Sequence, residues 1–157
     1  MYRFSKSAGV VLVVAALGFS SGAALGMGNS WSDSGDEKLK QAVTAVESKD
    51  YVGAINLLKD VLSGDAKNAD ALNYMGYSYR KLGNYERALA YYKRALNVKP
   101  DHRGANEYIG EAYLELKKPE MAKAHLDKLE KICGMSCAEY RELKKAFDDY
   151  QSKSRRS

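Results

Sequence analysis

Cys133 and Cys137 are the residues with the clearest capacity for chemistry, and they are the two cysteines of the 157-residue chain. Such a pair can act in thiol redox chemistry, bind a metal or form a structural disulfide. Two thiolates cannot complete a tetrahedral zinc site, and His102 and His125 do not stand at ligand spacing. A redox pair usually has the spacing C-x-x-C at a helix start beside a β-α-β unit, which is absent here. The sequence therefore favours a structural disulfide and no metal, with a thiol-redox or sensor protein as the alternative.

The disulfide carries a geometric condition. Cysteines four residues apart in an unbroken helix have Cβ atoms too far apart to bond, so the helix must end near Gly134. An even cysteine count and an oxidising compartment favour the bond.

Other catalytic patterns are missing. An enzyme needs a nucleophile with a base, a set of metal ligands or a phosphate-binding loop, and the sequence contains none of these. We therefore expect a protein that is not an enzyme and needs no cofactor.

Composition predicts an all-α protein of one domain. The chain has two prolines, 29% charged and 45% hydrophobic residues, and a net charge of +5. Acidic and basic residues alternate along the expected helices, as at Glu120 and Lys123, rather than forming the basic stripe of a nucleic-acid-binding protein. We therefore expect no nucleic-acid partner.

The first residues are typical of a secretory signal peptide. Arg3 and Lys6 precede an apolar run from Gly9 to Phe19, and small residues follow. The apolar run is shorter than the roughly 20 residues of a membrane-spanning helix, which argues against the alternative of a retained anchor. We expect residues 1–26 to be removed, residues 27–35 to form a flexible leader, and the mature protein to be periplasmic or secreted without stable membrane insertion.

A period of 34 residues divides the remaining chain into blocks at about 35–68, 69–102 and 103–136. The middle block has two amphipathic stretches, each with apolar or small residues three and four positions apart. Gly83 and Asn84 stop the first helix, and Asn84 is a good N-cap for the second. Gly76 and Ala88 are small, as a close crossing of two helices requires.

These features resemble the tetratricopeptide repeat family. The residues that carry the resemblance are Leu72, Met75, Gly76, Tyr79, Gly83, Tyr85, Ala88, Tyr92, Ala95 and Pro100. The resemblance implies a right-handed α-solenoid of three helix hairpins over residues 36–136, followed by a capping helix at 137–152 and a frayed tail at 153–157. Ser136 and Glu139 have the spacing of a capping box for that last helix. Pro119 suits the first turn of the preceding helix.

The family also implies a protein–protein interaction adaptor or scaffold, because its first helices line a concave groove that holds a peptide or protein segment. Homo-oligomerisation stays open. The family's clamp for a terminal carboxylate is not implied, since Leu39, Val43, Tyr74, Gly104 and Tyr108 stand where that clamp has Lys, Asn and Arg. The expected groove residues are Leu39, Val43, Val46, Glu47, Asn73, Tyr77, Arg80, Lys81, Glu107, Glu111 and Glu115.

Overall fold

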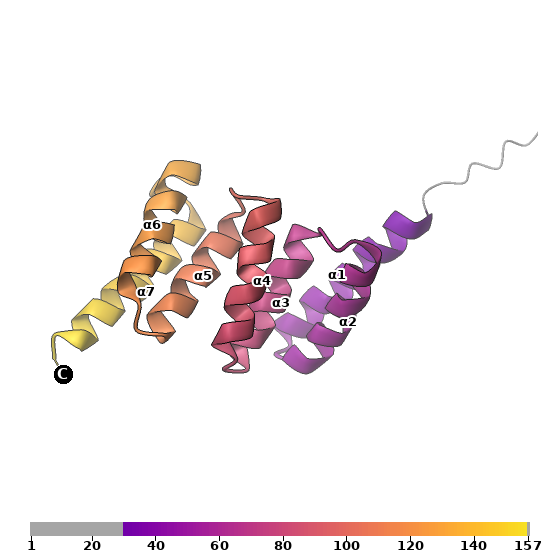
Figure 1. The fold of residues 1–157 in the computed structure, drawn as a ribbon, viewed down its shortest axis with the longest axis horizontal. Coiled ribbons are helices and arrows are strands. Elements are labelled where there is room, and N and C mark those ends of the chain that lie inside the picture. Colours follow the sequence, from indigo (N-terminus) through magenta and orange to yellow (C-terminus); the bar gives the residue numbers. More distant parts are fainter. Residues whose placement is uncertain (1–29, 157) are drawn as a thin grey trace, which may run out of the picture.

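The computed structural model describes residues 30–156, and these fold into seven α-helices without a strand (Figure 1). The predicted signal peptide lies outside the described residues. None of the described helices combines the length and apolar character that crossing a membrane requires. The helices are α1 Ser30–Glu47, α2 Tyr51–Gly64, α3 Ala69–Lys81, α4 Tyr85–Val98, α5 Arg103–Glu115, α6 Pro119–Cys133 and α7 Ala138–Ser154.

Successive helices pair into hairpins that stack side by side along the long axis (Figure 1). Helix α3 contacts both α1 and α5, whereas α2, α4 and α6 contact only the helices before and after them in the chain. The first helix of each hairpin therefore forms the inner, concave layer. Helix α7 packs on α5 and α6, where the first helix of a fourth hairpin would lie. The predicted all-α solenoid is confirmed.

Polar side chains cap the helices that follow tight turns. Asp50, Asn68 and Asn84 each accept a hydrogen bond from the backbone N–H three residues later, at 2.8, 2.9 and 3.2 Å. Gly83 has a φ of 77°, a conformation that costs glycine little. The turn and cap predicted at Gly83 and Asn84 are confirmed, as is Pro119 in the first turn of α6.

Two glycines permit the closest crossings. A Cβ atom on Gly76 of α3 would lie 2.6 Å from the ring of Tyr92 in α4. A Cβ atom on Gly110 of α5 would lie 2.6 Å from Leu143 in α7. Tyr92 and Leu143 are both fully buried, so neither side chain has free space to move into.

Three local expectations differ from the structure. Helix α1 begins at Ser30, so residues 30–35 of the expected leader are helical. Helix α7 continues through Ser154, two residues into the expected frayed tail. The Ser136 capping box is wrong, because Cys137 is the N-cap of α7 and no side chain caps that helix. Glu139 is then one position too early in the helix to reach back to the cap.

Substitution of Gly76 by alanine tests the α3–α4 crossing. Alanine favours a helix by about 1 kcal/mol over glycine, but at Gly76 its methyl group overlaps a buried ring. We expect Gly76→Ala to lower the free energy of unfolding by about 1–3 kcal/mol, measured by urea denaturation. Gly64→Ala is the matched control, since a Cβ atom there meets nothing within 4 Å, and it should be neutral or stabilising. Equal stability of the two variants would contradict the close crossing.

Candidate functional site

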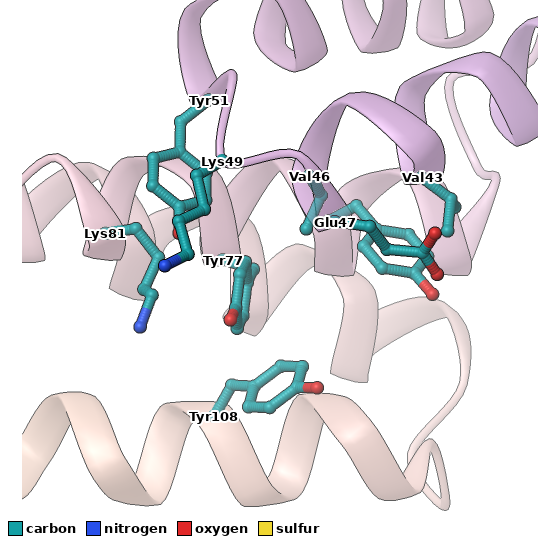
Figure 2. A pocket seen from close by; sticks show the side chains of 9 residues that line it. Val43, Val46, Glu47, Lys49, Tyr51, Tyr77, Lys81 and Tyr108 are labelled. Atoms are coloured by element: carbon teal, nitrogen blue, oxygen red, sulfur yellow. The ribbon is translucent and has the colours of Figure 1, made fainter.

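The concave layer contains a hollow of about 350 Å³ between α1, α3 and α5. Tyr77 of α3 and Tyr108 of α5 form its floor and face one another across the space between the two helices (Figure 2). Valines and Glu47 lie at one end, and Lys49 and Lys81 lie at the other (Figure 2). The lining residues are Val43, Val46, Glu47, Lys49, Tyr51, Tyr74, Tyr77, Lys81 and Tyr108.

The tyrosines on the floor contact each other and two cations. The ring centroid of Tyr77 lies 4.9 Å from that of Tyr108 and 6.3 Å from that of Tyr51. The guanidinium carbon of Arg80 lies 5.4 Å from the centroid of Tyr77 and 5.7 Å from that of Tyr108, within the range of cation–π attraction. Lys81 Nζ lies 5.5 Å from the Tyr77 centroid. These contacts make an aromatic surface with a positive edge.

Arg80 connects this surface to an acidic region. Its Nη2 atom lies 2.6 Å from Glu111 Oε2, and the Arg80 side chain is 11% exposed. Burial alone would lower the pKa of Arg80, but the charge of Glu111 and the contact with Tyr92 hold it above its ordinary value. The guanidinium therefore stays charged and fixed in place.

Glu107 is the acidic residue with the most unusual environment. Burial, followed by the charges of Glu111, Glu139 and Glu142, raises its pKa from 4.5 to about 8. Arg80 acts in the opposite direction but more weakly. The Glu107 carboxyl group is therefore largely protonated at neutral pH.

Three buried polar atoms lack a hydrogen-bond partner within the part of the chain that the structure describes: Asn73 Oδ1, Arg80 Nε and Tyr92 Oη. Two of them belong to α3, on the concave layer, and the third belongs to the ring packed beneath Gly76. Buried polar atoms are almost always paired, and the side chains of Arg80 and Tyr92 interact with each other. Asn73 Oδ1 is therefore the one of these three atoms that indicates a place where water or a ligand binds.

The structure distributes the predicted groove residues among three environments. Five of them line the hollow between α1, α3 and α5. Another three line a second hollow of about 480 Å³ toward α7. The rest lie within the packing, with Leu39 against the first core and Asn73 and Glu107 buried. The first group is Val43, Val46, Glu47, Tyr77 and Lys81, and the second is Arg80, Glu111 and Glu115.

Sequence reasoning missed four lining residues. Lys49 lies in the α1–α2 turn, where its φ is 66°, and Tyr51 begins α2. Both were outside the expected groove, which was taken from first helices alone. Tyr74 and Tyr108 do lie on first helices, and the signal that identifies them is their shared position in successive repeats, 34 residues apart.

The two histidines have structural roles. His102 Nδ1 accepts the backbone N–H of Ala105 at 3.1 Å, so Nε2 carries the proton and donates it to Asp70 at 2.9 Å. His102 thus caps α5 and ties it to α3. His125 Nδ1 lies 3.0 Å from Asn106 Oδ1, and burial lowers the pKa of His125 to about 4, so the ring is neutral at physiological pH.

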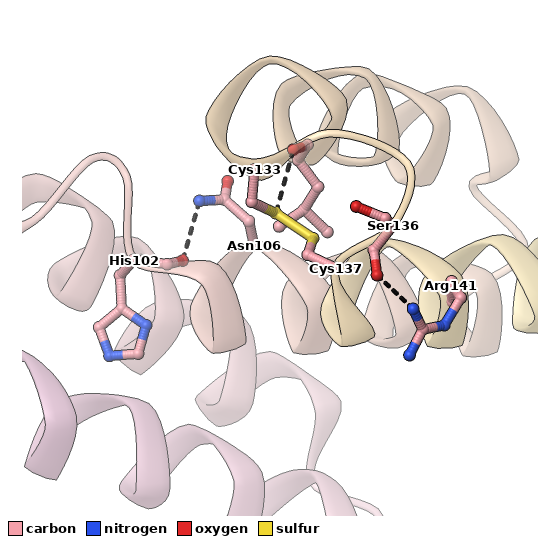
Figure 3. The surroundings of a disulfide bond; sticks show 7 residues. His102, Asn106, Cys133, Ser136, Cys137 and Arg141 are labelled. Carbon is pink, nitrogen blue, oxygen red and sulfur yellow. Dashed lines mark hydrogen bonds between the residues drawn. A yellow bond between two sulfur atoms is a disulfide. The ribbon is translucent and has the colours of Figure 1, made fainter.

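Cys133 and Cys137 form a disulfide at the joint between α6 and α7 (Figure 3). Their sulfur atoms are 2.08 Å apart and their Cα atoms 5.9 Å apart. Helix α6 ends at Cys133, and Gly134 follows with a φ of 77°, as the geometric condition required. Arg141 donates to the carbonyl oxygen of Ser136 inside the same joint. The bond therefore fixes the start of α7 beside the end of α6.

Comparison with known families and curated proteins identifies one type of repeat. Residues 69–102 match the tetratricopeptide repeat family model. The chain is 31% identical over 74 residues to human protein O-mannosyl-transferase TMTC3, covering 47% of the chain and 8% of that protein. It is 33% identical over 81 residues to a DnaJ protein P58IPK homolog of Arabidopsis thaliana, and the match covers 52% of the chain and 16% of that protein. The chain thus spans only a small part of these relatives.

Solved structures share the fold at low sequence identity. The tetratricopeptide domain of Sgt2 from Aspergillus fumigatus has a TM-score of 0.68 at 24% identity, covering 78% of this chain and 82% of that chain. The first such domain of Spaghetti (RPAP3), bound to an HSP90 peptide, has a TM-score of 0.67 at 18% identity. The match covers 76% of this chain and 95% of that chain. The Yersinia enterocolitica chaperone SycD, in complex with a peptide of the translocator YopD, has a TM-score of 0.67 at 14% identity. The match covers 78% of this chain and 95% of that chain.

The joint between α6 and α7 leads to a redox prediction. Protein taken from its native compartment should contain no alkylatable thiol by mass spectrometry. Reduction should lower the free energy of unfolding by about 2 kcal/mol, since the closed loop is short. A Cys133→Ser, Cys137→Ser double variant is the control and should not respond to reductant. Two alkylated cysteines in the native protein would contradict the disulfide.

Glu107 leads to a pH prediction. Its folded pKa of about 8 lies above the ordinary value of 4.5, so the folded protein binds the extra proton and loses stability as pH rises between these values. Glu107→Gln cannot ionise and avoids that loss. Between pH 4.5 and about 8, the free energy of unfolding of the variant should rise relative to wild type by up to about 1.4 kcal/mol for each pH unit. Below pH 4.5 the difference between the two proteins should not change with pH. Urea denaturation at several pH values measures the difference, and a constant difference would refute the pKa shift.

Proposed function

Because the chain belongs to the tetratricopeptide repeat family, we propose that it is a non-enzymatic adaptor that binds a segment of another protein along its concave helix layer. The observation that carries this proposal is the floor of the first hollow, where Tyr77 and Tyr108 contact each other and Arg80 of the second hollow lies against both rings. Tyrosine and arginine dominate binding energy at protein interfaces, because they bury a large area and also form directional polar contacts.

The shape of the site also supports a protein segment as the ligand. Two hollows follow each other along the concave layer, one between α1, α3 and α5 and the other between α5 and α7. An extended or helical segment can contact both hollows, whereas a small metabolite would occupy only one.

The neighbours that were solved with peptides support this assignment by analogy of fold. Their identity to this chain is below 25%, so they support the mode of binding and not the partner. The mannosyl transfer in the name of one relative is not assigned to this chain, because the match covers 8% of that protein.

Export to the periplasm or to the outside of the cell is part of the proposal. It rests on the charged, apolar and small-residue pattern of residues 1–26 and on the cysteine pair, which needs an oxidising compartment to stay bonded. In this setting Cys133 and Cys137 stabilise the α6–α7 joint, and we do not assign them a thiol-redox function.

Affinity capture with groove variants tests the proposed function. Partner proteins retained by the wild-type chain are identified by mass spectrometry and then measured with Tyr77→Ala and Arg80→Ala. Loss of a central aromatic or arginine contact should weaken capture by about tenfold or more. Val98→Ala is the control, because Val98 is exposed on the outer helix α4.

Two further measurements make the result decisive. Circular dichroism verifies that each variant keeps its helices. The Cys133→Ser, Cys137→Ser double variant should still capture the partner, whereas its failure would revive the thiol-redox alternative. Unchanged capture by both Tyr77→Ala and Arg80→Ala would reject the groove as the binding site.

A further inference from the structure

Two lysines at one end of the first hollow have no acidic partner. Lys49 and Lys81 both line this hollow and lie at the end away from Glu47 (Figure 2). Neither forms an ion pair with any residue in the described range 30–156. Lys81 Nζ lies 5.5 Å from the centroid of the Tyr77 ring, a contact that leaves its charge unneutralised. This end of the hollow therefore offers two ammonium groups to an anionic ligand.

The acidic residues closest to Lys49 in the sequence are engaged or placed elsewhere. Asp50 follows it directly, but the Asp50 carboxylate accepts the backbone N–H of Gly53 at 2.8 Å and caps α2. Glu47 lies beside the valines at the opposite end of the hollow (Figure 2). The positive charge of Lys49 and Lys81 therefore has no use within the fold.

The backbone at Lys49 also indicates a use for its side chain outside the turn. Its φ of 66° is in the left-handed region, which lysine adopts at a greater cost than glycine. The matching position of the second hairpin, 34 residues later, is Gly83, with a φ of 77°. A glycine at position 49 would thus form the α1–α2 turn more easily. Residues held in such conformations concentrate at functional sites, and Lys49 lines the hollow.

The floor beside the lysines suits an apolar side chain. The ring centroids of Tyr77 and Tyr108 are 4.9 Å apart, and two valines extend this surface away from the lysines (Figure 2). Arg80 lies against both rings but is already paired with Glu111 at 2.6 Å. The volume of about 350 Å³ is at the low end of the roughly 300–1,000 Å³ that ligand pockets enclose. The hollow therefore accommodates one or two side chains of a bound segment.

We propose that the first hollow binds an acidic side chain of the partner segment at Lys49 and Lys81, next to an aromatic or large aliphatic side chain that packs on Tyr77 and Tyr108. This inference rests on the proposed function, because it assigns a ligand chemistry to one end of the same concave layer. Charge complementarity identifies the occupant, since a carboxylate neutralises the two lysines. Glu47 repels a second acidic residue at the other end, so the segment lies in one direction.

The carboxylate comes from a side chain within the segment rather than from a chain terminus. The five positions of the family's clamp for a terminal carboxylate have aliphatic residues, glycine or tyrosine in this chain. Lysine carries a point charge on a flexible stem, without the fixed fork of donors that arginine presents to a carboxylate. Such a group tolerates variation in where the carboxylate lies, as the longer and more mobile attachment of a side chain requires.

Short amidated peptides test this chemistry. The purified protein is titrated with acetyl-Ala-Phe-Glu-Ala amide, and shifts of its backbone amide signals are followed by NMR. The same peptide with Gln in place of Glu measures the charge requirement, and with Ala in place of Phe it measures the apolar requirement. We expect the Phe-Glu probe to shift residues of α1, α3 and α5 around the first hollow. It should bind about fivefold or more tightly than either of the other probes.

Two lysine variants separate the site from the general charge of the protein. Lys49→Gly and Lys81→Gln should each weaken the Phe-Glu probe about threefold or more and leave the Phe-Gln probe unchanged. Lys59→Gln is the control for the loss of one positive charge, because Lys59 is exposed on the outer helix α2. It should bind both probes as the wild-type protein does.

The turn variant also has a matched control for stability. Lys117 occupies the same position in the third hairpin, with a φ of 57°. Lys49→Gly and Lys117→Gly should both be at least as stable as wild type in urea denaturation, because glycine adopts this conformation readily. Weaker probe binding by Lys49→Gly then cannot come from loss of folding.

Several results would overturn the proposal. Equal binding of the Phe-Glu and Phe-Gln probes is one, and binding of the Phe-Glu probe by both lysine variants as tightly as by wild type is another. Absence of shifts from the Phe-Glu probe at millimolar concentration is a third. Tighter binding of the Phe-Gln peptide with a free carboxyl terminus would indicate recognition of a chain end. Sodium phosphate giving the same shifts as tightly as the probe would indicate a simple anion site.

The outcomes distinguish this site from the proposed function. Capture that is lost in Tyr77→Ala but unchanged in Lys49→Gly and Lys81→Gln leaves the adaptor function and removes the recognition of an acidic residue. Conversely, probe binding that needs both lysines, with capture unchanged in Tyr77→Ala and Arg80→Ala, leaves the probe site and removes the groove assignment.

Discussion

Contact between a glycine and a large buried side chain determines where the helices of this protein can lie. Gly76 receives the ring of Tyr92 and Gly110 receives the side chain of Leu143, with no room for a Cβ atom at either position. The ring centroid of Tyr92 also lies 6.3 Å from that of Tyr108, which forms the floor of the first hollow together with Tyr77. The candidate site therefore depends on the α3–α4 crossing, although neither Gly76 nor Tyr92 lines the hollow.

Local signals were sufficient to predict most of the fold. The Gly83–Asn84 turn and Pro119 each act over a few residues, and the 34-residue period repeats the same helix pattern along the chain, so their effect can be read from the sequence. The start of α7 could not be predicted in this way. Ser136 and Glu139 have the right spacing for a capping box, but the cap is Cys137, whose side chain is bonded to Cys133 at the end of the preceding helix. The polar residues after Ser30 gave no sign of the helix that they form.

The candidate site was predictable where it follows the repeat and unpredictable where it depends on packing between repeats. Val43, Val46 and Tyr77 were expected from the resemblance to the groove positions of the tetratricopeptide repeat family. Glu107 was expected on a solvated helix face, as is usual for a charged residue. Helix α7 packs on α5, and only the packed structure shows that Glu107 is 9% exposed, with its pKa raised by burial and by the charges of Glu111, Glu139 and Glu142.

The inner helices touch one another, whereas the outer helices do not. The inner layer is therefore joined by direct helix contacts from α1 to α5, which the outer layer of α2, α4 and α6 does not have. Tyr77 and Tyr108 lie on that inner layer and contact each other across it. A receptor surface that is arranged before binding loses less conformational entropy on association.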